Sequence, residues 1–160
     1  DIQTYVWIKT LASITTGVSS YVVLLFVGVD FPEFWAFLIF MLNFIPTIGS
    51  IIATLFPAVL TLVQFEAPLQ PFLIVLLSVG SIQFLIGSVI EPRLLGASLN
   101  LSPLVVLLSL ALWGSIWGIA GMFLCVPLTV ICVIILAHFG QTRPIAVLLS
   151  GNGKLRFVDG

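Results

Sequence analysis

The chain has 160 residues, of which 61% are hydrophobic and only 7% are charged, with a formal net charge of −1. Soluble domains average about 25% charged residues, so this composition predicts an all-α integral membrane protein. The sequence shows no basic stripe for nucleic acid, no nucleophile–base set, no phosphate loop and no Cys/His spacing typical of metal sites. We therefore expect neither an enzyme nor a nucleic-acid-binding protein, and no cofactor or metal.

The first apolar stretch, residues 11–29, is long enough to cross a hydrocarbon core of about 30 Å. Tyr5, Trp7 and Lys9 precede it and are of types typical of the membrane interface. Within the stretch, small and hydroxyl residues share one helical face, which favours close helix packing or the lining of a polar path. These residues are Ser13, Thr16, Gly17 and Ser20.

Residues 34–64 follow an acidic turn with Pro32 and are apolar except at one run, Asn43–Ser50. Pro46 and Gly49 interrupt the helix there, and each arm is too short for a full crossing. A bilayer tolerates such a break only where protein or water covers the backbone. Discontinuous helices are also where transporters build binding sites, so this break is the first candidate site.

A second acidic turn at Glu66 precedes another span, residues 70–90. Gln83 lies in its polar stripe and should face other helices or water rather than lipid. We expect Glu91–Pro92–Arg93 to close this helix, with Glu91 paired to Arg93. The pair is either a gate that opens when the carboxylate is protonated or a plain ion pair at the interface.

The second broken segment, residues 103–138, begins at Pro103 and ends at His138. Its arms are residues 104–113 and 119–138, and the predicted break runs from Trp113 to Gly121. Three glycines mark this break: Gly114, Gly118 and Gly121. We interpret it mainly as a packing element. The order of proline, break and second proline echoes the first broken segment.

The positive charges of the loops predict the topology. Arg93 and Arg143 should be cytoplasmic, whereas the turns at 30–33 and 66 carry no positive charge and can lie outside. Both broken segments then become re-entrant hairpins that enter the membrane from opposite sides. The competing topology lets each broken segment cross the membrane. Residues 1–140 are the predicted transmembrane domain, and residues 141–160 the predicted cytoplasmic tail.

Several runs together resemble the autoinducer-2 exporter (AI-2E) family of bacterial permeases. They are Leu42–Ser50, Ile90–Gly96, Leu101–Leu104, Trp117–Met122 and Val126–Leu128, and their order and spacing match as well. The resemblance covers the C-terminal half of a family member. It implies a multi-pass transporter of the bacterial inner membrane and a homo-oligomer. It also implies either export of the quorum-sensing signal autoinducer-2 or sodium (lithium)/proton antiport.

The predicted substrate site needs hydrogen-bond donors and acceptors for a small polar solute. Asn43, Thr47, Ser50 and Gln83 supply both, and backbone groups freed around Pro46 and Gly49 add more. Asn43 has a second interpretation as a helix C-cap. Glu91 and Arg93 are the predicted gating or coupling pair. A non-transporting membrane scaffold, in which the breaks only serve packing, is the third hypothesis.

Overall fold

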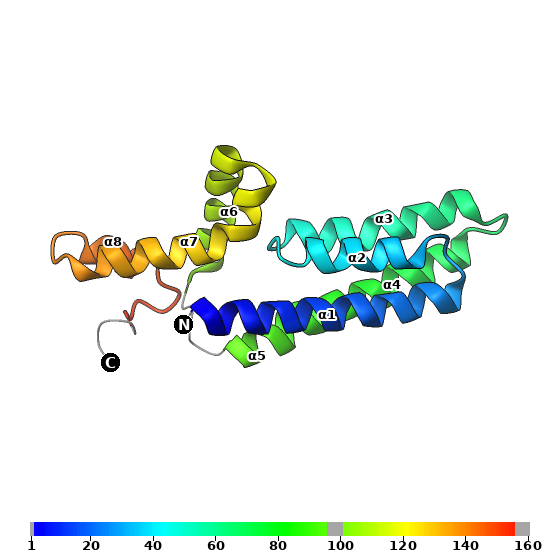
Figure 1. Ribbon diagram of the computed structural model, residues 1–160, viewed down its shortest axis with the longest axis horizontal. Coiled ribbons are helices and arrows are strands. Elements are labelled where there is room, and N and C mark those ends of the chain that lie inside the picture. Colours follow the sequence, from blue (N-terminus) through cyan, green and yellow to red (C-terminus); the bar gives the residue numbers. More distant parts are fainter. Residues whose placement is uncertain (1, 96–100, 156–160) are drawn as a thin grey trace. The chain divides into compact units, whose positions relative to one another are not determined.

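The computed structural model describes residues 2–95 and 101–155, and within these ranges every named element is a helix (Figure 1). The chain divides into two compact units, one formed by Gln3–Leu95 and the other mainly by the helices after Gly96. Three helices are long and apolar enough to cross a membrane: Ile2–Val27, Leu69–Ile90 and Ile119–His138. The predicted all-α membrane class is therefore confirmed.

Helix α1 (Ile2–Val27) is longer than predicted, because it begins well before residue 11. Tyr5 and Lys9 are buried within the first unit, and their expected position at the membrane interface stays a prediction. The small and hydroxyl residues also face inward. A Cβ added at Gly17 would lie 3.2 Å from the carbonyl oxygen of Ala36. The stripe thus lets α1 approach the next helix closely, as small residues do in membrane bundles.

The first broken segment folds as two packed helices, α2 (Pro32–Leu42) and α3 (Ile48–Gln64), side by side in Figure 1. The side chain of Gln64 donates to the carbonyl of Gly28 and accepts from the N–H of Asp30, both at 2.8 Å. These bonds hold the end of α3 beside the turn that starts α2. The segment is therefore a helical hairpin, whose insertion from one membrane face stays a prediction.

Helix α4 (Leu69–Leu85) continues through a π-helical turn, η1 (Ile86–Ile90), into α5 (Glu91–Leu95). The prediction that Glu91–Pro92–Arg93 closes this helix is therefore wrong. Pro92 has no N–H to donate, and a π-helical turn is one way in which a helix absorbs an interruption of its hydrogen bonds. Such turns are rare and occur frequently at functional sites.

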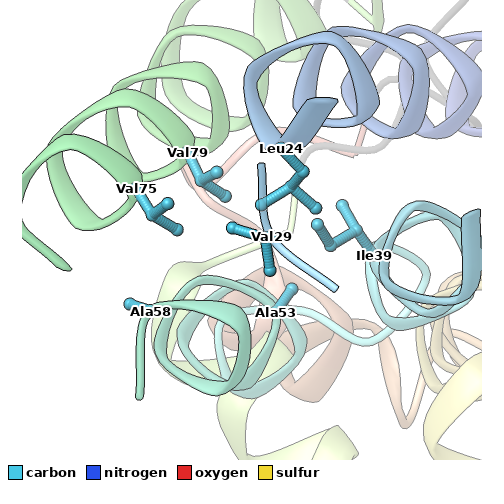
Figure 2. Close-up of a cluster of buried hydrophobic side chains, with 7 residues drawn as sticks. All are labelled: Leu24, Val29, Ile39, Ala53, Ala58, Val75 and Val79. Atoms are coloured by element: carbon cyan, nitrogen blue, oxygen red, sulfur yellow. The ribbon is translucent and has the colours of Figure 1, made fainter. Parts of the chain in front are cut away.

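Helices α1 to α4 enclose one apolar core. Figure 2 shows Leu24 of α1 and Val79 of α4 in the same cluster. Its buried members are Leu24, Val29, Ile39, Ala53, Ala58, Val75 and Val79. Outside, large apolar side chains are left uncovered, such as Phe26 at 88% and Val63 at 84% exposure. Such a surface suits lipid or further protein better than water.

The second broken segment forms α6 (Pro103–Trp117) and α7 (Ile119–His138), which pack against each other. Gly118 is the single residue between them, with φ of 64°. The break is therefore narrower than predicted, because Gly114 belongs to α6 and Gly121 to α7. Both glycines still serve close packing. A Cβ at Gly114 would lie 3.1 Å from the side chain of Met122, and one at Gly121 would overlap the carbonyl of Trp113.

Helix α7 changes direction along its length in Figure 1, and Pro127 lies inside it. A proline inside a helix removes one hydrogen bond and is the usual cause of a kink. Helix α8 (Arg143–Leu149) packs on the last turns of α7 through a small apolar cluster. Its members are Val133, Ala137, Ala146 and Leu155. The predicted tail thus contains a packed helix, and its cytoplasmic location stays a prediction.

Candidate functional site

Polar side chains gather on the inner faces of the first unit, although its helices are apolar. We call this set the polar seam. It consists of Lys9, Ser13, Thr16 and Ser20 of α1, Asn43 between α2 and α3, Gln83 of α4 and Glu91 of α5, all of them buried. On α1 the seam residues recur every three or four positions, so they occupy one helical face. Polar groups inside an apolar bundle need partners, and those partners define the seam's chemistry.

The seam ends at a buried ion pair between Lys9 and Glu91. The Lys9 Nζ donates to Glu91 Oε1 at 2.6 Å, and the two residues are only 8% and 7% exposed. Neither charge would be tolerated alone in apolar surroundings, so each stabilises the other. The predicted pairing of Glu91 with Arg93 is therefore wrong, and Arg93 is exposed. The ion pair links α1 to the helix that follows the π-helical turn.

Asn43 connects the hairpin to α1. Its Nδ2 donates to Ser13 Oγ at 3.0 Å, and both side chains are buried. The backbone N–H of Asn43 also donates to the carbonyl of Ile39, as at a helix C-terminus. Asn43 thus ends α2 with its backbone and reaches across to α1 with its side chain. The interpretation of Asn43 as a C-cap is therefore confirmed, whereas its contact with substrate stays a prediction.

The tip of the first hairpin is a strained turn. Thr47 has φ of 60° and ψ of −62°, and the N–H of Ile48 donates to the carbonyl of Pro46 at 2.6 Å. These values describe a γ-turn of the rare, strained kind, and a β-branched residue at its centre is a genuine outlier. Gly49 follows in the first turn of α3, where a Cβ would overlap the carbonyl oxygen of Leu42. Backbone strain of this sort concentrates at functional sites.

The predicted substrate residues fall into two groups. Asn43, Pro46, Thr47, Gly49 and Ser50 lie together at the hairpin tip, with Thr47 exposed and Asn43 and Gly49 buried. Gln83 instead lies on α4, eight residues before Glu91. Among the described residues, its Nε2 and Oε1 atoms have no hydrogen-bond partner, and neither does Ser20 Oγ. Leaving a buried polar group unpaired costs about 1–3 kcal/mol, so these atoms are the least satisfied part of the seam.

The second hairpin offers little polar chemistry at its tip. Trp117 and Ile119, on either side of Gly118, are 54% and 70% exposed. The indole Nε1 of Trp113 donates to Thr129 Oγ1 at 3.2 Å, which ties the two arms together. The ring of Trp113 also contacts that of Trp117, with centroids 5.6 Å apart. These contacts agree with the packing interpretation of Gly114 and Gly121, whereas Gly118 provides the turn and a Cβ there would meet nothing within 4 Å in the described part of the chain.

Four seam residues on α1 were not among the predicted site residues. Lys9 was assigned to the interface by its residue type, and Ser13, Thr16 and Ser20 to a stripe for helix packing or the lining of a polar path. A signal for all four was present, because they continue one helical face without a gap. A lysine on the same face as buried hydroxyl groups points inward rather than to the interface.

Comparisons with known proteins agree with the resemblance of the sequence motifs. A family model described as AI-2E family transporter matches residues 1–141. The AI-2 transport protein TqsA of Escherichia coli is 41% identical over 157 residues, covering 96% of this chain and 44% of that protein. A putative transport protein of Borreliella burgdorferi is 40% identical over 152 residues, covering 95% and 42%.

A putative transport protein of Haemophilus influenzae is 42% identical over 149 residues, which cover 91% of this chain and 41% of that protein. The chain thus spans less than half the length of these curated relatives. Together with the three membrane-capable helices, these matches identify a multi-pass membrane protein of bacterial type. The chain belongs to the AI-2E family of transporters.

Proposed function

We propose that the whole protein, of which this chain forms a part, exports a small polar solute across the bacterial inner membrane. Autoinducer-2 is the first candidate, because a relative at 41% identity is named as an AI-2 transport protein. Autoinducer-2 is hydroxyl-rich, so its passage needs hydrogen-bonding groups inside an apolar bundle. The polar seam supplies such groups. We further propose that the protein is a homo-oligomer, with its C-terminal tail in the cytoplasm.

The bond between Asn43 and Ser13 carries this proposal. It joins the hairpin tip to α1 through an amide and a hydroxyl. Each group can replace its bond to the other with a bond to a solute hydroxyl, so no hydrogen bond is lost overall. The strained turn at Thr47 lies in the same tip, and relief of that strain would favour its movement. We propose that the solute first contacts the hairpin tip and then Gln83 of α4. The proposed contacts at the tip are Asn43, Pro46, Thr47, Gly49 and Ser50.

Transport by variants of the full-length protein tests this function. In membrane vesicles, Asn43→Ala and Ser13→Ala should each lower autoinducer-2 export at least tenfold at unchanged protein level. The matched control is Thr15→Ala, because Thr15 is exposed on another face of α1 and its hydroxyl bonds only its own helix. Export at the parent rate by a folded Asn43→Ala variant would contradict the proposal and favour a scaffold role for the breaks.

The Lys9–Glu91 ion pair favours a second candidate function, monovalent cation/proton antiport. If the carboxylate of Glu91 left Lys9 to bind first a proton and then a cation, it would couple the movement of the cation to that of the proton. The pair also serves the exporter as a proposed gate, since protonation of Glu91 would remove its attraction to Lys9. Arg93 was predicted to share this role, but its exposure places it outside the pair.

Removal of both charges separates these two functions. The variant Lys9→Met/Glu91→Gln leaves no unpaired buried charge. Glu91→Gln alone would leave Lys9 buried and unpaired, which would lower the stability by about 3–5 kcal/mol. Antiport should lose its pH dependence in the double variant, while solute export should persist without gating by the protonation of Glu91. Pumping of sodium against a proton gradient by the double variant, with the parent's pH profile, would exclude Glu91 as the coupling group.

A further inference from the structure

Ser20 and Gln83 are buried polar residues whose hydrogen-bonding capacity is unused. Ser20 is 0% and Gln83 is 6% exposed. Ser20 Oγ and both amide atoms of Gln83 have no hydrogen-bond partner within residues 2–95 and 101–155. Trp35 Nε1 shares this property, but its ring packs on the apolar core and offers a donor only. Ser20 and Gln83 together offer donors and acceptors.

The antiparallel register of α1 and α4 indicates that these two residues lie at a similar level of the first unit. Helices α1 and α4 run antiparallel, because Gln64, just before α4, bonds Gly28 at the end of α1, while Glu91 pairs with Lys9 near its start. Leu24 and Val79 meet in the apolar core (Figure 2). Ser20 precedes Leu24 by one helical turn, and Gln83 follows Val79 by one turn. Both therefore lie one turn nearer the ion pair, on the inner faces of their helices.

We propose that Ser20 and Gln83 form a subsite that binds a hydroxyl group of the transported solute. The proposal rests on the export function above and names what one part of the solute contacts. A serine hydroxyl and a glutamine amide are complementary, yet they do not bond each other directly. A hydroxyl between them would accept from one and donate to the other, so each residue would gain one hydrogen-bond partner.

The chemistry of the subsite selects an uncharged ligand. The ion pair is centred about 12 Å further along α4, at 1.5 Å per residue from Gln83 to Glu91, so it does not balance a charge at the subsite. Hard cations take six or more oxygen ligands, whereas the two side chains supply two oxygens. A solute hydroxyl needs only one donor and one acceptor, which these residues provide.

Binding of autoinducer-2 to the purified full-length protein tests the subsite. We expect Ser20→Ala and Gln83→Leu each to raise the Kd at least tenfold. Thr15→Ala is the matched control and should leave the Kd unchanged, because its hydroxyl is exposed and bonds only Leu11. Gln83→Leu replaces an unpaired amide with an apolar side chain, so this variant should fold. Kd values within twofold of the parent for both variants would overturn the subsite.

A second measurement keeps the subsite testable if autoinducer-2 does not bind the parent protein at all. That result would contradict the proposed substrate, and ribose and glycerol then serve as hydroxyl probes through the rise that they cause in unfolding temperature. A rise that Gln83→Leu abolishes supports the subsite. The subsite is overturned if neither probe causes a rise that depends on Gln83. It is also overturned by a Gln83-dependent rise with sodium chloride alone, which would indicate a cation site.

Discussion

The two hairpins of this chain share one backbone construction. Each first arm begins with a proline at its first positions, and each second arm contains a proline in its interior. In each, the residue before the second arm has a positive φ, at Thr47 and Gly118. In each, a glycine near the start of the second arm lies so close to a carbonyl of the first arm that a Cβ would overlap it. This glycine is Gly49 in the first hairpin and Gly121 in the second. The hairpin shape therefore depends on backbone contacts.

The chemistry of the two tips is different. The first break places Asn43 in the buried seam, where it bonds Ser13 of another helix. The second break is one glycine, and the large side chains beside it are exposed. Threonine holds the strained turn in the first hairpin, whereas glycine takes the positive φ in the second. The comparison shows that one backbone design serves both hairpins, while the polar groups suited to a solute are found at the first.

The largest effect should come from filling the glycine contacts. Gly49→Ala and Gly121→Ala each place a Cβ on a carbonyl oxygen, so each should destabilise its hairpin by about 3 kcal/mol or more. Gly80→Ala is the control, because its Cβ would meet only Thr54 Cγ2 at an ordinary 3.6 Å. Reversible unfolding in detergent measures all three. If one of the two variants unfolded like the parent, the shared construction would not hold.

Smaller effects, opposite in sign to each other, should follow from substituting the two residues with positive φ. Thr47→Gly removes the strain of a threonine at φ of 60°, so it should stabilise the protein by about 1 kcal/mol. Gly118→Ala introduces a comparable strain at φ of 64° and should destabilise it by about 1 kcal/mol or more. Unfolding midpoints give the signs. A destabilising Thr47→Gly would mean that threonine makes an energetically important contact at the tip.

Much of the fold could be predicted because local residue types decide it. Pro32 and Pro103 open helices, His138 ends one, and the first break contains Pro46 as predicted. Both breaks were predicted too wide, because α3 already begins at Ile48 and only Gly118 separates α6 from α7. A glycine such as Gly114 marks a weak helix position, yet tertiary packing against Met122 keeps it helical. Local propensity does not show which of several glycines leaves the helix.

The partner of Glu91 could not be predicted from neighbouring residues. Arg93 is close in sequence, but residues two apart on a helix do not face each other, and α5 continues through both. Lys9 is 82 residues away and meets Glu91 only because α1 and α4 pack antiparallel. The tip residues were easier to group, since five of them are nearly contiguous. Ser20 and Gln83 lie on different helices, so their sequence positions alone do not group them.

The smallest effect on stability is expected from removing one side-chain hydrogen bond in each hairpin. This change should best distinguish the functions of the two hairpins. Asn43–Ser13 and Trp113–Thr129 are single side-chain bonds of 3.0 and 3.2 Å. Double-mutant cycles with Asn43→Ala/Ser13→Ala and Trp113→Phe/Thr129→Val should each give a coupling near 0.6 kcal/mol, roughly the average for such bonds in membranes. Export should nevertheless fall only in the first set, because only Asn43 and Ser13 belong to the polar seam. Equal losses of export in both sets would show that stability of the hairpins, rather than the chemistry of the first tip, limits transport.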